Sequence, residues 1–153
     1  DLLEVARRAR DPAGISAARQ RPAVRAKARA RILVAEDSDV IREAIRRELT
    51  RAGFEVVAAE DGAVALERAR AELFDAVSTD VMMPKLDGYE LTRALRQDPR
   101  YENVPIVMVT SKDARIDTLR GMDAGADLYL TKPADATELV RALDSLLAKR
   151  KNG

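Results

Sequence analysis

Five side chains of this 153-residue chain stand where short apolar runs end, and together they could do phosphoryl chemistry. The first run ends at Glu36 and Asp37, the second at Asp80, the third at Thr110 and the fourth at Lys132. If the runs are parallel strands, their carboxyl ends share one edge of a sheet, which is where open α/β sheets bind ligands. Three carboxylates, a hydroxyl and an ammonium gathered there suit a divalent cation and a phosphoryl group.

The three carboxylates predict a metal site. Carboxylates held close together repel one another unless a cation neutralises them, and Mg²⁺ is bound through carboxylates, water and phosphate oxygens. With the charge neutralised, an Asp oxygen can attack phosphorus, as carboxylates do in other covalent phosphoryl transfers. Thr110 can then donate a hydrogen bond to the product and Lys132 can supply a compact positive charge. We therefore expect Mg²⁺ as the cofactor.

From Arg31 onward, strand-like and helix-like segments alternate five times, which is typical of a parallel sheet covered on both faces. The expected strands are Ile32–Ala35, Phe54–Ala59, Ala76–Thr79, Ile106–Val109 and Leu128–Leu130. Each is followed by a helix, and the apolar residues expected on the buried helix faces are Ile41, Ile45 and Leu49; Leu66, Ala69 and Leu73; Leu91 and Leu95; Ile116, Leu119 and Met122; and Leu139, Leu143 and Leu146 or Leu147. Right-handed crossovers make this a doubly wound sheet, with Asp37 and Asp80 on the strands beside its switch point.

Local signals support these elements. Ser38 is a good N-cap for the first helix, and Gly53 ends that helix as a C-terminal glycine does. The second strand alternates more clearly between apolar and polar residues than the others, which predicts a place near an edge of the sheet.

Composition excludes several classes of function. The chain has no cysteine, so disulfides and thiolate metal sites are excluded, and it has no histidine, so it cannot be its own phosphohistidine donor. No apolar stretch approaches the roughly 20 residues of a membrane helix, and no signal peptide is visible. We expect a cytoplasmic protein without membrane contact.

The N-terminal part differs from the rest. Residues 1–31 carry nine Arg/Lys against three Asp/Glu, whereas the remainder is net acidic. No aromatic residue is interleaved with these basic residues, as an interface with single-stranded nucleic acid would require. We interpret residues 1–30 as a basic linker or helical extension that does not bind nucleic acid, and residues 31–150 as the globular domain. Asp1 in place of Met leads us to expect a piece of a longer protein.

Four short motifs, in order, resemble the receiver domain of two-component response regulators. They are Glu36-Asp37, Asp80 with Met83-Pro84 and Asp87-Gly88, Thr110-Ser111, and Lys132-Pro133, and the resemblance runs from about Arg31 to Leu147. It implies a flavodoxin-like fold with five helices and strand order 2-1-3-4-5.

The resemblance also implies a role for each site residue. Asp80 is the phosphoacceptor, and Mg²⁺ is held by Asp37, Asp80 and the backbone carbonyl of Met82, with Glu36 acting through water. Thr110 and Lys132 contact the phosphoryl group. Tyr129 is the aromatic switch residue, and the Lys132–Pro133 peptide bond is cis.

The implied function is to take a phosphoryl group from a histidine kinase and to switch conformation. Helix four, strand five and helix five, about Lys112–Lys149, would form the surface that a signalling partner reads. Segments 109–115 and 121–127 also look like receivers fused to chemotaxis kinases, so we expect the C-terminal receiver of a chemotaxis-type hybrid histidine kinase. The alternative is a free-standing single-domain response regulator that binds a motility or signalling target.

Other interpretations stay open at this point. A Mg²⁺-dependent phosphatase with an aspartyl nucleophile places a second Asp two residues later as acid/base; Met82 stands there, so we expect no enzyme acting on an external substrate. Nucleotide binding needs a glycine-rich loop after the first strand, and residues 36–39 contain none. A receiver that serves only as a binding module would not need every chemical residue intact. Individually, Thr110 is compatible with a helix cap and Tyr129 with core filling.

Overall fold

The computed structural model describes residues 29–110, 123–131 and 136–152. Within them lies a five-stranded parallel sheet with the order β2-β1-β3-β4-β5. Its strands are β1 (Arg31–Ala35), β2 (Glu55–Ala59), β3 (Ala76–Asp80), β4 (Ile106–Thr110) and β5 (Leu128–Thr131). The expected sheet and its strand order are confirmed, and β2 lies at an edge as its alternation predicted.

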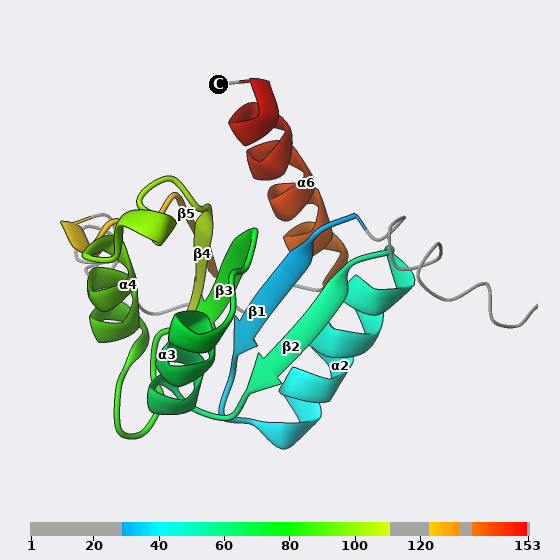
Figure 1. Cartoon of the computed structure of the whole chain (residues 1–153). Coiled ribbons are helices and arrows are strands. Elements are labelled where there is room, and N and C mark those ends of the chain that lie inside the picture. The colour runs from blue at the N-terminus through cyan, green and yellow to red at the C-terminus, as the bar shows by residue number, and fades with distance from the viewer. Residues whose placement is uncertain (1–28, 111–122, 132–135, 153) are drawn as a thin grey trace, which may run out of the picture.

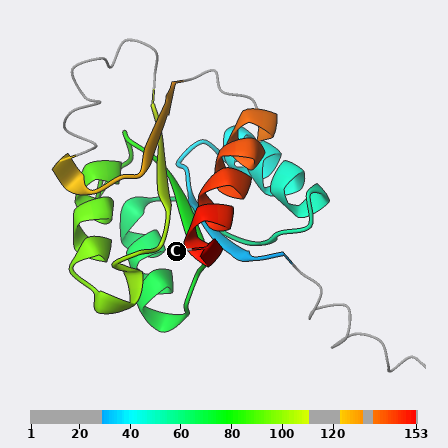
Figure 2. The ribbon, with the colours of Figure 1, turned by 90° about the horizontal axis from the view of Figure 1, so that it is seen from above.

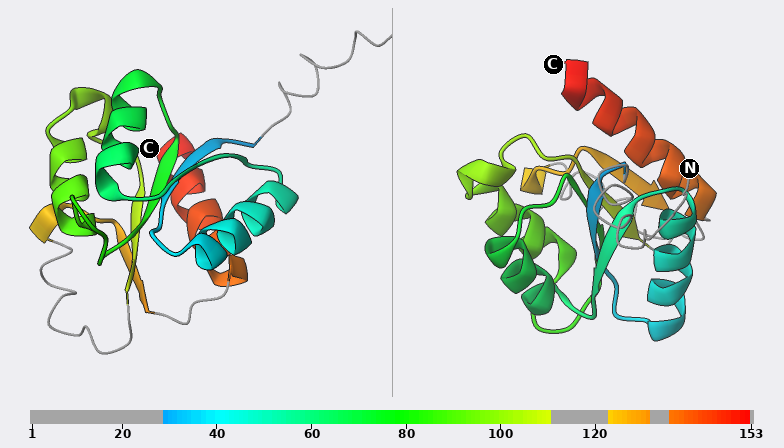
Figure 3. Two further views of the ribbon diagram at one scale, coloured as in Figure 1. Left: turned by 90° about the horizontal axis from the view of Figure 1, so that it is seen from below. Right: turned by 45° about the vertical axis from the view of Figure 1, so that its right-hand side comes forward.

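Helices cover both faces of the sheet, as Figures 1 and 2 show. α3 (Gly62–Ala71) and α4 (Gly88–Arg96) lie on one face, and α2 (Asp39–Arg51) and α6 (Ala136–Asn152) on the other. The two further views in Figure 3 show α6 running past the amino ends of the strands. None of the helices in the described ranges is both long and apolar enough to cross a membrane.

The expected number of five helices is not confirmed. The described residues contain four α-helices and a short 3-10 helix, Pro99–Tyr101. The helix expected around 116–122 lies outside the described residues, apart from helical Asp123 and Ala124 just after it.

Each face of the sheet has its own apolar core, because alternate strand residues point to opposite sides. Leu33 and Ala35 of β1 belong to the core beneath α3 and α4, whereas Ile32 and Val34 belong to the core beneath α2 and α6. All four side chains are almost fully buried. β1 and β4 are almost continuous apolar runs because both of their faces are covered.

Capping residues fix both ends of α2 and the start of α3, and two of them, Ser38 and Gly53, were expected from the sequence. The Ser38 hydroxyl accepts the N–H of Ile41 at 3.3 Å, and the Asp61 carboxylate accepts the N–H of Val64 at 2.8 Å. Gly53, just past the end of α2, has φ +101°, a left-handed conformation that favours glycine.

Two residues expected on buried helix faces are instead exposed. Leu73 is 57% exposed because α3 ends at Ala71, which leaves Leu73 in the turn before β3. Ile41 is 39% exposed because it lies in the first turn of α2, and burial along this helix is complete only at Leu49.

Candidate functional site

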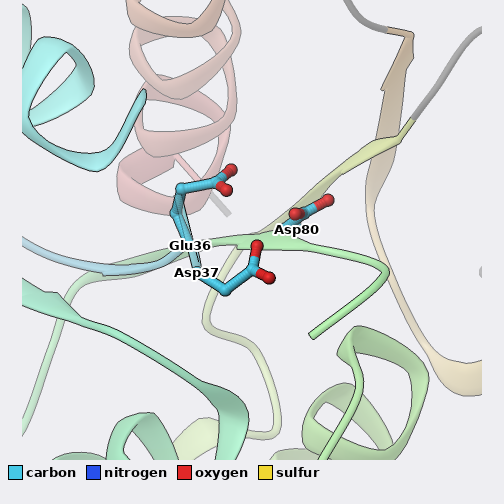
Figure 4. Close-up of side chains that lie close together, drawn as sticks. All are labelled: Glu36, Asp37 and Asp80. Carbon is cyan, nitrogen blue, oxygen red and sulfur yellow. The ribbon is translucent and has the colours of Figure 1, made fainter. Parts of the chain in front are cut away.

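Three carboxylates meet at the carboxyl ends of β1 and β3. Glu36 and Asp37 directly follow β1, and Asp80 is the last residue of β3. One oxygen atom from each side chain can be chosen so that all three lie within 4.8 Å of one another. Figure 4 shows the carboxylates gathered on one side of the chain, Glu36 and Asp37 from one strand end and Asp80 from its neighbour. The expected cluster of Glu36, Asp37 and Asp80 therefore forms.

The register of the sheet explains this meeting. β1 and β3 are hydrogen-bonded neighbours in which Ala35 pairs with Thr79. Asp80 is one residue beyond that pair on β3, and Asp37 is two residues beyond it on β1. Glu36 and Asp80 are 2% and 7% exposed, whereas Asp37 is exposed. A cation bound there would touch solvent on the Asp37 side.

Backbone groups and a guanidinium orient the Glu36 segment. The N–H of Ser38 donates to Glu36 Oε2 at 3.0 Å, and the N–H of Glu36 donates to the carbonyl of Ala59 at 3.0 Å. The guanidinium of Arg42, from the first turns of α2, donates to the Glu36 carbonyl at 2.9 Å. The acidic turn is thus fixed to both β2 and α2.

Hydrogen bonds also hold the backbone and the side chain of Asp80 in place. The N–H of Val81 donates to Asp80 Oδ1 at 2.8 Å, and the Thr79 hydroxyl donates to the Asp80 carbonyl at 2.8 Å. The N–H of Gly88 donates to the Val81 carbonyl at 2.8 Å, and a Cβ on Gly88 would lie only 2.3 Å from the Asp80 carbonyl oxygen. Only glycine allows α4 to begin this close to Asp80.

The loop between Asp80 and α4 carries the Met82 carbonyl. The Met82 side chain is 73% exposed, so it contributes little to the core. Lys85 has φ +71°, and its ammonium lies 3.7 Å from the buried carboxylate of Asp61 at the start of α3. This ion pair links the loop to the start of α3. No local sequence signal predicts it, because the two residues are far apart in the chain.

The other expected site residues are placed only in part. β4 ends at Thr110, one position beyond Val109, which pairs with Asp80 in the register. The backbone of Thr110 pairs with Thr131, the residue just before Lys132. Thr110 is therefore at the same edge as the carboxylates. Lys132 and Pro133, with their expected cis bond, lie outside the described residues.

Tyr129 lies on β5 and is half-buried. Its hydroxyl is 3.2 Å from the hydroxyl of Tyr89 in the first turn of α4, and its ring packs against a buried cluster that includes Met108 and Ala126. Tyr129 contributes to the core in this conformation. Both interpretations from the sequence, core filling and switch residue, are compatible with that position.

The chemistry of the donor atoms fits a hard divalent cation. The cluster offers carboxylate oxygens, and the whole chain has neither histidine nor cysteine to attract a softer metal. Oxygen-only ligand sets of this kind suit Mg²⁺. Glu36, Asp37 and Asp80 are the residues that would hold it.

Two grooves in the described part lie away from this cluster. The first, of about 550 Å³, is at the amino ends of the strands and is lined by Arg29, Phe54, Asp144 and Arg150 among others. Arg29 pairs there with Asp144, and the Arg150 guanidinium lies 3.7 Å from Asp75. Because its charges are already paired, we place the functional site at the carboxylate cluster.

The chain matches the model of the response regulator receiver domain over residues 32–144 and belongs to that family. It is 42% identical over 121 residues to response regulator MprA of Mycobacterium ulcerans (strain Agy99), an alignment that covers 79% of this chain and 51% of the relative. The chain thus spans about half the length of the curated relatives it matches.

Solved receiver structures share the fold. Chemotaxis response regulator CheY4 of Vibrio cholerae has a TM-score of 0.73 at 34% identity, covering 76% of this chain and 98% of that one. The receiver domain of sensor histidine kinase PA1611 from Pseudomonas aeruginosa PAO1 has a TM-score of 0.72 at 33% identity, covering 78% and 98%. The latter structure has a magnesium ion coordinated in its active-site cleft.

Proposed function

We propose that this receiver domain accepts a phosphoryl group on Asp80 from a histidine kinase and relays the signal through a change of conformation. The observation that supports this most directly is the meeting of Glu36, Asp37 and Asp80 at the carboxyl ends of two neighbouring strands. Membership of the receiver family supports the choice of a phosphohistidine donor.

In the transfer, a carboxylate oxygen of Asp80 forms a bond to phosphorus while the bond from phosphorus to the donor's histidine nitrogen breaks. The nitrogen keeps the electron pair of that bond and can take a proton. The Val81 N–H fixes the Asp80 carboxylate through Oδ1, so the carboxylate is oriented before the donor arrives. Such orientation lowers the entropy lost on reaching the transition state.

Mg²⁺ bound by Asp37, Asp80 and the Met82 carbonyl, with Glu36 acting through water, would neutralise the charge shared by the carboxylates and the phosphoryl oxygens. Thr110 donates a hydrogen bond to the phosphoryl group, and Lys132 pairs with it. With Met82 in place of a second Asp, the domain has no acid/base residue at that position for hydrolysing an external substrate. We propose that it is a phosphoacceptor rather than an enzyme of that kind.

Phosphorylation would draw Thr110 toward Asp80 and move Tyr129, and so alter the surface of the 112–149 region. That surface is the proposed binding site for a signalling partner. Phosphorylation would shift a pre-existing equilibrium between two conformations rather than create a new fold.

For the parent protein, we propose a chemotaxis-type hybrid histidine kinase that carries this receiver in the cytoplasm. The similarity to a receiver that is itself part of a sensor histidine kinase supports this. The similarity to CheY4 favours the second candidate, a free-standing response regulator.

A tethered receiver meets its kinase at high effective concentration. Removing residues 31–153 from the parent kinase should therefore change phosphoryl flow to other regulators; unchanged flow would contradict the hybrid-kinase proposal.

The metal requirement can be tested with acetyl phosphate, a small phosphodonor. With Mg²⁺ it should give one acid-stable, hydroxylamine-sensitive phosphoryl group per chain, and EDTA should prevent labelling. Asp37→Ala should weaken Mg²⁺ binding in calorimetry and slow labelling, whereas Glu67→Ala, which removes an exposed carboxylate on α3, should change neither. Equal labelling with EDTA, or equal Mg²⁺ affinity of Asp37→Ala, would contradict the proposed metal site.

A further inference from the structure

A pair of tyrosine hydroxyls joins α4 to β5. Tyr89, in the first turn of α4, is 2% exposed and belongs to a buried cluster with Val81, Met108 and Ala126, among others. Tyr129 on β5 packs against this cluster, and the two hydroxyl oxygens are 3.2 Å apart. Either hydroxyl can be the donor. The contact spans 40 residues of sequence and connects the helix that follows Asp80 with the edge strand of the sheet.

The same turn of α4 is fixed to the backbone that follows Asp80. Gly88, the residue before Tyr89, donates its N–H to the Val81 carbonyl at 2.8 Å. A Cβ at Gly88 would lie 2.3 Å from the Asp80 carbonyl oxygen and 2.9 Å from Val81 Cα. The hydrogen bond and the close approach of the two backbone segments couple them, so we expect a displacement of the backbone after Asp80 to carry Gly88 and Tyr89 with it.

Hydrogen bonds also hold the first turn of α4 together as a unit. Asp87 accepts the N–H of Glu90 at 2.8 Å, and the Glu90 carboxylate accepts the N–H of Asp87 at 2.9 Å. This reciprocal capping box fixes the orientation of the first turn, and Tyr89 lies between its two members. The position of the Tyr89 hydroxyl is therefore set by the segment that carries Asp80.

We propose that Tyr89 is the positioning residue for Tyr129. Its hydroxyl holds Tyr129 in the half-buried position while Asp80 is unphosphorylated, and it passes a displacement at Asp80 on to β5. The second part of this inference rests on the proposed phosphorylation of Asp80, whereas the first part does not. Because one hydrogen bond contributes little net free energy, its loss should shift the population of Tyr129 positions by roughly two- to twelvefold.

The chain suits a direct test because it has three tyrosines and no tryptophan. Labelling with 3-fluorotyrosine gives one ¹⁹F NMR resonance for each tyrosine, and single Tyr→Phe variants assign them. Tyr89→Phe removes only the hydroxyl. It should move the Tyr129 resonance of the unphosphorylated protein toward its position in the wild type with beryllofluoride and Mg²⁺, and it should shrink the further change on adding beryllofluoride.

Tyr101→Phe is the matched control. Tyr101 is fully buried in the core beneath α3 and α4, whereas Tyr129 packs against a different cluster. The single hydrogen of the Tyr101 hydroxyl is shared between the carbonyl oxygens of Ala69 and Glu72, each 2.7 Å from the hydroxyl oxygen. Its removal should lower stability and leave the Tyr129 resonance in place. A general loosening of the core would move the Tyr129 resonance in both variants, and that result would overturn the proposal.

The proposal would also be overturned if, before beryllofluoride is added, the Tyr129 resonance of Tyr89→Phe stays at its wild-type position. If Tyr89→Phe does not fold, Tyr129→Phe replaces it, and the Tyr89 resonance must then shift, since coupling is reciprocal. An unchanged Tyr89 resonance rejects the proposal. Failure of beryllofluoride to perturb the Val81 amide in the wild type is a separate result, which would contradict the proposed function instead.

Discussion

At the scale of single residues, the carboxylates of Glu36, Asp37 and Asp80 repel one another. Glu36 and Asp80 are nearly buried and Asp37 lies beside them, with carboxylate oxygens within 4.8 Å of one another. Placing like charges this close costs free energy unless a cation is present. Sites kept for function at a cost in stability are a common feature of proteins.

This repulsion predicts how stability responds to Mg²⁺ and to a charge-removing change. Without Mg²⁺, Asp80→Asn should raise the free energy of unfolding by about 1 kcal/mol, because it removes one of three crowded charges. Mg²⁺ should stabilise the wild type in proportion to its occupancy and stabilise Asp80→Asn less. Urea unfolding with Mg²⁺ or EDTA measures both effects, and Glu67→Gln, at an exposed position on α3, controls for a change of net charge. Equal stabilisation of Asp80→Asn by Mg²⁺ would show that Asp80 is not a ligand.

At the scale of elements, Arg96 connects α4 to the segments before β4 and β5 through hydrogen bonds and an ion pair. The Arg96 guanidinium donates to the carbonyls of Tyr101 and Val104, each at 2.7 Å, and pairs with Asp127 at 2.7 Å. Its Nε donates to the carbonyl of Gly125 at 2.9 Å. Asp127 in turn accepts the N–H of Ile106 at 2.8 Å. The network holds the C-terminal end of α4 together with the segments that lead into β4 and β5.

Arg96→Lys should therefore not be a conservative change. A lysine ammonium lacks the planar fork that reaches several carbonyls at once, so the free energy of unfolding should fall by about 2 kcal/mol. Arg93→Lys, an exposed site on the same helix, should change it by less than about 0.5 kcal/mol. Equal effects of the two variants in urea unfolding would contradict this account of α4.

Ion pairs between arginine and glutamate side chains predict the response to acid. The hydrogen bond from Arg31, followed by that from Arg68, lowers the pKa of Glu72 from its ordinary value of 4.5. The hydrogen bond from Arg46 lowers the pKa of Glu43 to about 2. Because these carboxyls have lower pKa values in the folded state, their contribution to stability is present above pH 4.5 and is lost as the pH falls through the folded-state pKa of each group, which is about 2 for Glu43.

The melting temperature should therefore change little between about pH 7 and 5 from these groups and fall below about pH 4.5. Glu72→Gln should flatten part of this acid-side fall, whereas Glu67→Gln, on the exposed side of α3, serves as the control. Circular dichroism melts across the range give the comparison. An acid-side fall that is as steep in Glu72→Gln as in the wild type would refute the role of Glu72.

At the scale of the whole molecule, the sheet order brings the chemistry together. β1 and β3 are neighbours, so the residues after them meet, and β4 and β5 follow on the same side. The sequence was sufficient to predict this order, the strand ends to within one residue, and the cluster of Glu36, Asp37 and Asp80. Apolar runs, capping residues and the receiver motifs are local signals, and each of them could be read directly.

Contacts between distant side chains could not be predicted in this way. The hydroxyl pair of Tyr89 and Tyr129 and the ion pair of Lys85 and Asp61 depend on how α4 and its loop pack, and no sequence period marks them. Leu73 was wrongly expected to be buried because apolar spacing does not show where a helix ends. The contact of Tyr89 with Tyr129 can be recognised only in the folded structure.

The central claim is that Asp80 is the acceptor of one phosphoryl group. Intact-mass measurement after incubation with acetyl phosphate and Mg²⁺ tests it most directly. The wild type and the nearby control Asp39→Asn should each gain the mass of one phosphoryl group, which hydroxylamine removes, and Asp80→Asn should gain none. Undiminished, hydroxylamine-sensitive labelling of Asp80→Asn would contradict the claim.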